Sequence, residues 1–359
     1  MYSPWRYLSY IFWKNQPLQL TFFVTGRCNA RCPFCFYLKA EEQLETDHQE
    51  LSVEEIEKIS SSLGRLLWVL FSGGEPYLRE DIVKISRIIY ENNKPVVLTY
   101  PTNGLLPEVI KEKTEQILRR CQKSIVVVKL SLDGLNDRLD VLRGVPGSFE
   151  KIMQTYQGLG ELLGKYPNLE LGVNTVFCSA NQDNMEEIIE FVNGLDKIRT
   201  HTISLVRGRL QEKKYQDVDL EKYRDAIEIL ERNLKNKTGS IYRFKGACLK
   251  AAQDILQRRL IYQTMRRQQR IIPCYAGRLN IVLTETGDVY PCESFDQTMG
   301  NVRDFNYNVR EMLHSVQAKE IISRIRKNGC YCSHECYFMT NILFNPRLLA
   351  DIAKQYLLS

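Results

Sequence analysis

The chain has 359 residues, and its 44% of hydrophobic side chains can bury one large core or two smaller ones. Its formal net charge of +6 is a mild excess spread along the sequence, so nucleic acid is not expected as a partner. Eleven cysteines in a chain without a secretory signal favour a reducing, cytoplasmic compartment and metal binding over disulfides.

The N-terminal segment, residues 1–17, begins with aromatic and basic side chains such as Trp5, Arg6 and Trp13. It lacks the small-residue cleavage site of a signal peptide, and no apolar run in the chain is long enough to span a membrane. We expect this segment to pack over the end of the fold. The alternative is peripheral membrane contact through residues 1–14, which would make the protein membrane-associated.

Between residues 18 and 207, short apolar runs alternate with amphipathic segments. Such runs are typical of parallel strands covered on both faces. Six strands are expected, at Leu18–Thr25, Leu66–Phe71, Pro95–Tyr100, Ser124–Leu132, Asn168–Phe177 and Arg199–Val206. The helices expected between them include one opened by the capping box Ser52–Glu55, then Asp81–Tyr90, Glu108–Arg120, Phe149–Leu163 and Asp183–Val192.

This alternation predicts an α/β fold, a partial (β/α)6 parallel barrel, in which active-site groups gather at the carboxyl ends of the strands. After it, residues 208–265 are expected to form a helical connector, with helices at Leu220–Leu234 and Ala247–Gln269. The basic stretch Arg258–Arg270 is interpreted as a solvated helix face, with binding of an acidic partner as the alternative. A second cysteine-rich region begins at Cys274, so residues 266–359 are expected to form a cysteine-rich C-terminal domain.

Three cysteines, Cys28, Cys32 and Cys35, directly follow the first expected strand. Three thiolates on one loop can hold one inorganic centre, and a cubane iron–sulfur cluster with three protein ligands keeps one iron open. Cysteine pairs at this spacing also occur in zinc sites, but those usually close with a second pair of ligands. His48 stands alone, so we favour a [4Fe-4S] cluster over zinc.

Polar or glycine-rich motifs lie at the ends of the following strands. They are Ser72-Gly-Gly-Glu-Pro76, Thr102-Asn-Gly104 and Ser131-Leu-Asp-Gly134, with Arg143 further on and Asn174 in the fifth strand. Glycines let the backbone approach a ligand, and Glu75 can accept a hydrogen bond from an ammonium group. Each motif alone is weak, because most such sequences are turns. Together, beside the cysteine loop, they predict one binding site.

These motifs resemble those of the radical S-adenosylmethionine (SAM) superfamily over about residues 18–207. The Cys-x3-Cys-x-aromatic-Cys loop of that family is matched by Cys28, Cys32, Phe34 and Cys35. The resemblance implies that the open iron binds SAM, and that reductive cleavage of SAM gives a 5′-deoxyadenosyl radical that abstracts hydrogen from a substrate. It also implies a set of SAM contacts: Gly73, Gly74 and Glu75 with the methionine amino group, Ser131 and Asp133 with the ribose, Arg143 with the methionine carboxylate, and Asn174 and Leu205 with the adenine.

Five more cysteines lie in the C-terminal region. Cys274 and Cys292 flank an expected hairpin of strands Leu279–Leu283 and Val289–Tyr290, whereas Cys330, Cys332 and Cys336 are close in sequence. The pattern resembles the SPASM/twitch extension of radical SAM proteins. A complete SPASM domain holds two auxiliary clusters and needs more cysteines, so the resemblance implies one auxiliary [4Fe-4S] cluster. Its firmer ligands are Cys274, Cys292 and Cys336, with Cys332 ahead of Cys330 for the fourth place; the alternative is a zinc knuckle that uses His334.

A fully ligated auxiliary cluster favours electron transfer, and therefore a net oxidation or a coupling. A one-electron reductase such as flavodoxin or ferredoxin would supply electrons. Only 17 residues precede the first expected strand, which leaves no room for a peptide-recognition domain there. We therefore expect a small-molecule, sugar or lipid-linked substrate, with a peptide as the alternative. An alternative of another class is a non-catalytic iron–sulfur or zinc-binding sensor or scaffold.

We expect the protein to contain about eight irons per chain after anaerobic reconstitution, because each of two cubane clusters holds about four. About four irons would indicate one cluster, and stoichiometric zinc would contradict the auxiliary cluster. Replacing Cys28, Cys32 or Cys35 by alanine should abolish the formation of 5′-deoxyadenosine in the presence of dithionite, which chromatography measures. Activity that survives these substitutions would refute the ligand assignment.

Overall fold

The computed structural model describes residues 1–37, 49–236, 247–327 and 329–358. His48, which was considered as a zinc ligand, lies outside them. All six expected strands are present and pair in parallel in chain order. They are β1 (Gln19–Thr25), β2 (Trp68–Gly73), β3 (Val97–Thr102), β4 (Ile125–Ser131), β5 (Leu169–Phe177) and β6 (Thr200–Leu205).

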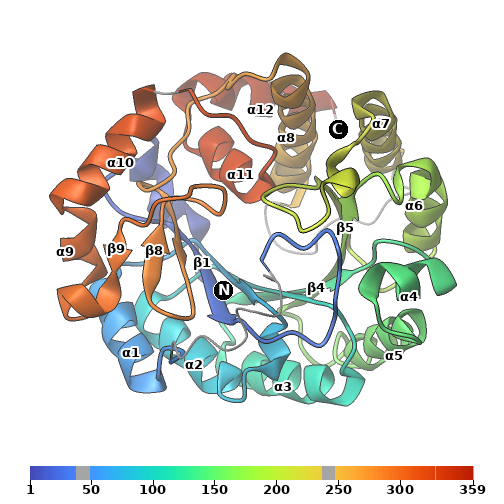
Figure 1. The fold of residues 1–359 in the computed structure, drawn as a ribbon, viewed down its shortest axis with the longest axis horizontal. Coiled ribbons are helices and arrows are strands. Elements are labelled where there is room, and N and C mark those ends of the chain that lie inside the picture. The colour runs from blue at the N-terminus through green and yellow to red at the C-terminus, as the bar shows by residue number, and fades with distance from the viewer. Residues whose placement is uncertain (38–48, 237–246, 328, 359) are drawn as a thin grey trace.

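Helices cover the outer face of this sheet (Figure 1). The helices between the strands are α1 (Val53–Ser62), α2 (Ile82–Asn93), α3 (Pro107–Arg120), α4 (Asp137–Arg143), α5 (Ser148–Gly160) and α6 (Met185–Asn193). The expected capping box is confirmed, since the side chains of Ser52 and Glu55 each accept a hydrogen bond from the backbone N–H of the other. Short 3₁₀ helices lie at Pro4–Ile11, Pro76–Leu78, Gln182–Asn184, Lys213–Gln216, Val302–Phe305 and Pro346–Leu348.

The C-terminal region continues the same sheet. The strand β7 (Asn280–Leu283) pairs in parallel with β1, and β8 (Asp288–Tyr290) and β9 (Gly300–Asn301) follow in antiparallel pairs. The helices of this half are α7 (Leu220–Lys235), α8 (Ala247–Arg267), α9 (Val309–Leu313), α10 (Val316–Lys327), α11 (Glu335–Leu343) and α12 (Leu349–Leu358). In Figure 1, α8, α11 and α12 lie between α7 and α10, so the C-terminal elements complete the ring of helices around the barrel.

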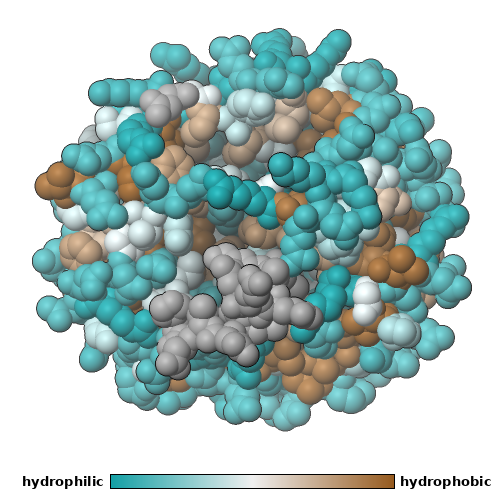
Figure 2. Space-filling model, in the orientation of Figure 1, coloured by the Kyte–Doolittle hydropathy of each residue, from teal (hydrophilic) through white to brown (hydrophobic). Residues whose placement is uncertain are grey.

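Two large apolar clusters fill most of the described molecule, and a third, small one lies around Phe34. The larger one lies between the sheet and the outer helices, and on β4 it takes the alternate residues Val126, Val128 and Leu130. The intervening residues of that strand face the barrel interior, and the first two of them, Ile125 and Val127, belong to a smaller cluster. Most members of the smaller cluster come from strand beginnings, so it closes the amino end of the barrel. Hydrophilic residues cover most of the rim seen in Figure 2, as expected when helices turn their apolar faces inward.

The N-terminal segment packs over that closed end, as expected. Tyr7 is 3% exposed, belongs to the smaller cluster and donates a hydrogen bond to the carbonyl of Leu66. Five large hydrophobic side chains of the segment are exposed: Met1, Trp5, Leu8, Phe12 and Trp13. Within the described ranges, no helix combines the length and the apolar character needed to cross a membrane.

A buried ionic group joins the end of β6 to the C-terminal region. The Arg207 guanidinium donates to Glu293 at 3.2 Å and to Glu335 at 3.3 Å, and Glu293 also contacts His334 Nε2 at 2.7 Å. Burial lowers the pKa of His334, but Glu293 outweighs this effect and the pKa rises to about 9. The guanidinium also lies over the ring of Phe36, next to the first cysteine loop. One side chain therefore contacts both cysteine regions.

We expect Arg207→Met to lower the free energy of unfolding by about 3 kcal/mol, because it leaves two buried carboxylates without their main cation. Arg209→Met is the matched control. Arg209 bridges the same two segments through Asp296, but its side chain is 86% exposed, so the expected loss is below about 1 kcal/mol. Denaturant unfolding of both variants measures the difference, and equal losses would show that the buried group does not join the two halves.

Candidate functional site

The first cysteine loop begins where β1 ends, at the carboxyl edge of the sheet. Cys35 donates its N–H to the carbonyl of Cys32 at 3.1 Å, and Cys28 Sγ accepts from the N–H of Ala30 at 3.5 Å. Burial raises the pKa of Cys28 to about 11, so a thiolate there needs a nearby positive charge such as a metal. Across the described parts of the chain, no three potential ligands already form a metal-binding group.

Gly73, the last residue of β2, and Gly74 directly after it hold the cysteine loop in place. The N–H of Gly74 donates to the carbonyl of Thr25, and the N–H of Glu75 to that of Arg27, both at 2.8 Å. Gly73 has a φ of +114°, and a Cβ there would lie 2.4 Å from the Thr25 oxygen. A Cβ on Gly74 would lie 2.0 Å from the Arg27 oxygen. Only glycine permits this contact, so the Gly-Gly pair positions the cysteine loop directly.

Glu75 lies at the ends of β2 and β3 and is 1% exposed. Its carboxylate accepts hydrogen bonds from Thr102 Oγ1 at 2.9 Å, from the N–H of Asn103 at 2.7 Å and from the N–H of Tyr77 at 3.2 Å. Burial raises its pKa to about 7. A carboxylate has about four acceptor positions, so one remains for an ammonium group. The expected contact of Glu75 with the methionine amino group stays a prediction.

Asn103 is a site residue that sequence analysis missed, although the motif that contains it was noted. Its Nδ2 donates to Asn29 Oδ1 at 2.7 Å and lies 3.7 Å from Cys28 Sγ. Its position directly after a strand and before a glycine was the available clue. Asn103 thus joins the end of β3 to the cysteine loop.

A buried ion pair approaches the same loop from β4. Asp133 accepts from Arg143 Nη2 and from the N–H of Val176, and Arg143 Nη1 donates to Cys32 Sγ at 3.3 Å. Burial raises the pKa of Cys32, and the guanidinium opposes this shift. Arg143 Nε is buried without a partner in the described residues, which leaves a donor for a ligand. The expected contact with the methionine carboxylate is compatible with this donor, while the Asp133 carboxylate is already engaged.

The remaining expected SAM contacts lie on β4, β5, β6 and the cysteine loop. Ser131 and Asn174 are partners in register, and Asn174 Oδ1 accepts from Ser204 Oγ at 3.1 Å. Leu205 belongs to the main core, so only its backbone is free to border an adenine. Phe34 is buried and packs edge-on against the ring of Tyr215, so in this arrangement it anchors the first cysteine loop.

The second cysteine region surrounds the β7–β8 hairpin and the start of α11. Cys274, Cys292, Cys332 and Cys336 are half-buried and Cys330 is exposed. The preference for Cys332 over Cys330 as the fourth ligand stays a prediction. Burial raises the pKa of Cys292, and the nearby Cys332, Cys274 and Cys330 raise it further. Cys274, Cys292, Cys330 and Cys332 are therefore electrostatic neighbours, and Cys336 is not among the thiols that act on Cys292. Such a group suits an inorganic centre that supplies positive charge.

His334 does not fit the zinc alternative in this arrangement. Its Nε2 faces Glu293 and Arg207, and its other ring nitrogen is buried without a partner in the described residues. A zinc ligand needs a ring nitrogen that is free to bind the metal, whereas Nε2 is engaged by Glu293 at 2.7 Å.

Family models match both halves of this arrangement. The radical SAM superfamily model matches residues 22–192, and the model of the SPASM iron–sulfur cluster-binding domain matches residues 274–337. The chain belongs to the radical SAM superfamily and carries a C-terminal SPASM domain. Its cofactors are a SAM-binding [4Fe-4S] cluster, SAM itself, and auxiliary iron–sulfur cluster binding by the SPASM domain.

Relatives and solved structures support the same assignment. An AdoMet-dependent heme synthase of Nitratidesulfovibrio vulgaris is 25% identical to this chain. The match covers 78% of this chain and 75% of the heme synthase. The subtilosin biosynthesis protein AlbA of Bacillus subtilis is 26% identical over 89% of this chain and 66% of its own. The structure of Streptococcus suis SuiB bound to S-adenosylmethionine has the same fold, with a TM-score of 0.62 and 18% sequence identity. The superposition covers 86% of this chain and 68% of the SuiB chain.

We expect Gly74→Ala to lose about half of the bound iron, because the added Cβ would displace the loop that carries Cys28, Cys32 and Cys35. Formation of 5′-deoxyadenosine should fall with it. Gly164→Ala is the matched control, since a Cβ there meets no heavy atom within 4 Å. Iron analysis of both reconstituted variants measures the effect, and full iron with unchanged SAM cleavage in Gly74→Ala would contradict the positioning role.

Proposed function

We propose that this chain is a radical SAM enzyme that modifies a peptide substrate. The observation that carries the proposal is the match to AlbA, a bacteriocin biosynthesis protein, over 89% of the chain. The fold is also that of SuiB, solved with the precursor peptide SuiA, and of anSMEcpe, solved with AdoMet and a peptide. These comparisons favour a peptide over the small-molecule, sugar or lipid-linked substrate expected from sequence.

In this proposal, the carboxyl edge of the sheet is the SAM site. When bound to Cys28, Cys32 and Cys35, the cluster and SAM together supply a 5′-deoxyadenosyl radical that abstracts hydrogen. Arg143 contributes its free Nε–H to the methionine carboxylate and keeps a positive charge beside Cys32. Glu75 contributes its remaining acceptor position to the amino group. The buried surroundings keep water away from these contacts.

The SPASM region would remove the electron left on the substrate. Cys274, Cys292, Cys332 and Cys336 are the proposed ligands of one fully ligated auxiliary cluster. Arg207 holds Glu293 and Glu335, each next to one of these cysteines in sequence, against the end of β6. The reaction would then be a net oxidation or coupling, with a flavodoxin or ferredoxin as the electron donor.

A second candidate is a reaction on a porphyrin. Three relatives named AdoMet-dependent heme synthase match 78–81% of this chain at 25–26% identity, and the match covers 71–80% of their own length. The same site would serve either substrate, because the radical is generated in the same way.

The test is substrate-dependent SAM cleavage by the anaerobically reconstituted protein. We expect short peptides encoded beside its gene to raise the rate of 5′-deoxyadenosine formation and to lose a pair of hydrogens, which mass spectrometry detects. Cys28→Ala protein is the control and should give neither product. Turnover of an iron porphyrin with unchanged peptides would overturn the peptide proposal in favour of the second candidate.

A further inference from the structure

A lysine lies inside the barrel where the apolar filling ends. On β4, the residues that face the interior are Ile125, Val127, Lys129 and Ser131, in alternation with the core residues. The first two join the smaller apolar cluster at the amino end. Ser131 lies at the carboxyl end, at the expected SAM site. Lys129 therefore lies between the apolar cluster at the amino end of the barrel and the expected SAM site at its carboxyl end.

Its neighbours leave the lysine room to cross the sheet. Lys129 is in register with Gly172 on β5, which is in register with Thr200 on β6. A Cβ on Gly172 would lie 2.5 Å from Thr200 Oγ1 and 3.5 Å from Lys129 Cγ, so glycine keeps this space open. The ammonium passes over β5 and donates to Thr202 Oγ1 at 2.7 Å.

The charge of Lys129 has no counter-ion in the described residues. An ammonium group has three N–H donors, and one of them is used, by Thr202. Asp254 of α8 is close enough to influence Lys129, but it forms an ion pair with Lys250. Burial lowers the pKa of Lys129, as expected for a cation without a compensating anion. Lys129 is half-buried, and a charge partly removed from water without a counter-ion is costly, so an anionic partner would stabilise this arrangement.

The position suits a substrate group. Lys129 is two residues before Ser131, and its electrostatic neighbours include Glu335 and Cys336 at the start of α11. It thus lies next to the expected SAM site on β4 and within electrostatic reach of the start of α11. A substrate that loses hydrogen at one cluster and an electron to the other has to occupy this region.

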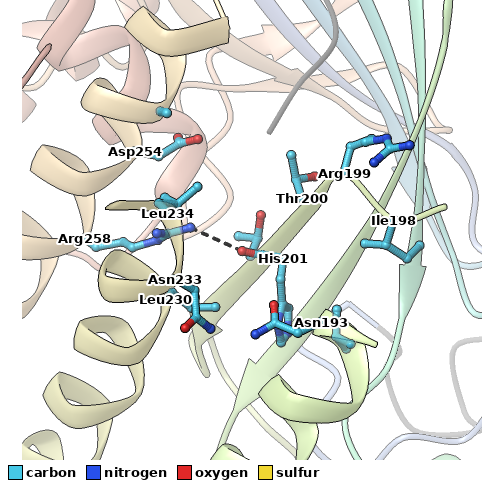
Figure 3. A pocket seen from close by; sticks show the side chains of 13 residues that line it. Asn193, Ile198, Arg199, Thr200, His201, Leu230, Asn233, Leu234, Asp254 and Arg258 are labelled. Atoms are coloured by element: carbon cyan, nitrogen blue, oxygen red, sulfur yellow. Dashed lines mark hydrogen bonds between the residues drawn. The ribbon is translucent and has the colours of Figure 1, made fainter. Parts of the chain in front are cut away.

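Arg258 and Asp254 (Figure 3), together with Thr202, line a cavity of about 50 Å³ beside β6. Lys129 is not among its lining residues and adjoins the cavity through its hydrogen bond to Thr202. The cavity has room for a few waters or one carboxylate group. Arg258 of α8 reaches across it and donates to the carbonyl of His201 at 3.2 Å. Its second terminal nitrogen, Nη1, and Thr200 Oγ1 are buried without partners in the described residues. Arg258, assigned from sequence to a solvated face, therefore points inward with a free donor.

We propose that Lys129, with Thr202 and Arg258, binds a carboxylate group of the substrate inside the barrel. This inference rests on the proposed function, because the group that is bound would be an acidic side chain of the peptide substrate. Lys129 and Thr202 contribute donors on the sheet, and Arg258 contributes one from α8. The bound carboxylate would fix the peptide relative to both clusters.

The test uses the reconstituted enzyme with SAM and needs no turnover. The probe is N-acetylglutamic acid α-amide, with neutral N-acetylglutamine amide as its isostere and N-acetylalanine as a source of a terminal carboxylate. At a saturating concentration, we expect the glutamic acid probe to raise the melting temperature by about 2 °C. The neutral isostere should give no rise. A rise with N-acetylalanine alone would support the carboxylate site and assign it to a peptide C-terminus.

Variants separate binding from stability. Lys129→Met and Thr202→Val should abolish or weaken the rise, and Lys129→Arg should retain it because the charge is kept. Lys113→Met is the matched control: Lys113 is also half-buried, but its ammonium is already bound by the carbonyls of Tyr77 and Arg79. It should respond to the probe like the native protein.

Either of two outcomes overturns the inference. One is no rise with any carboxylate in the native protein, which would mean that the cavity holds water only. The other is an equal rise in Lys129→Met. Failure of the peptide proposal is distinguishable, because the native protein would then bind the carboxylate probe without turning over any peptide.

Discussion

The central position of β1 is the constraint on which the rest of the molecule depends. All seven of its residues are buried, and it pairs in parallel with β2 on one side and β7 on the other. The first cysteine loop leaves its carboxyl end. The turn after β7 returns to the same place, where Glu285 contacts Tyr37 and the N–H of Leu51. One strand therefore fixes the SAM-binding half and the SPASM half in a single frame.

Most of the barrel could be predicted from the sequence, because its strands and helices follow from local periodicity. The pairing of β1 with β7 could not be predicted, because it joins segments about 260 residues apart and leaves no local pattern in the sequence. Asn103 and Arg207 were missed for the same reason. Each acts through a partner distant in sequence, Asn29 in one case and Glu293 and Glu335 in the other. The cysteines could be proposed as ligands because their spacing alone carries chemical information, and that assignment stays a prediction.

Several of the interior charges in the described residues are paired with one another. Asp133 and Arg143 form one buried pair, and Arg207 with Glu293, Glu335 and His334 forms a buried group. Such groups contribute little net stability, but they hold polar atoms in fixed orientations, which preorganises a site before its ligands arrive. Lys129 differs, because its charge is left for a partner from outside the chain.

The pairing of β1 with β7 also has a consequence for biosynthesis. On the ribosome, β1 emerges early and can pair with β2 soon afterwards, but its other edge stays open until residue 283 has been made. An open edge with buried-type side chains can pair with other chains, and long-range pairing is slow. The nascent protein thus passes through a stage with an exposed central strand. Truncation before β7 would make that stage permanent and would favour aggregation.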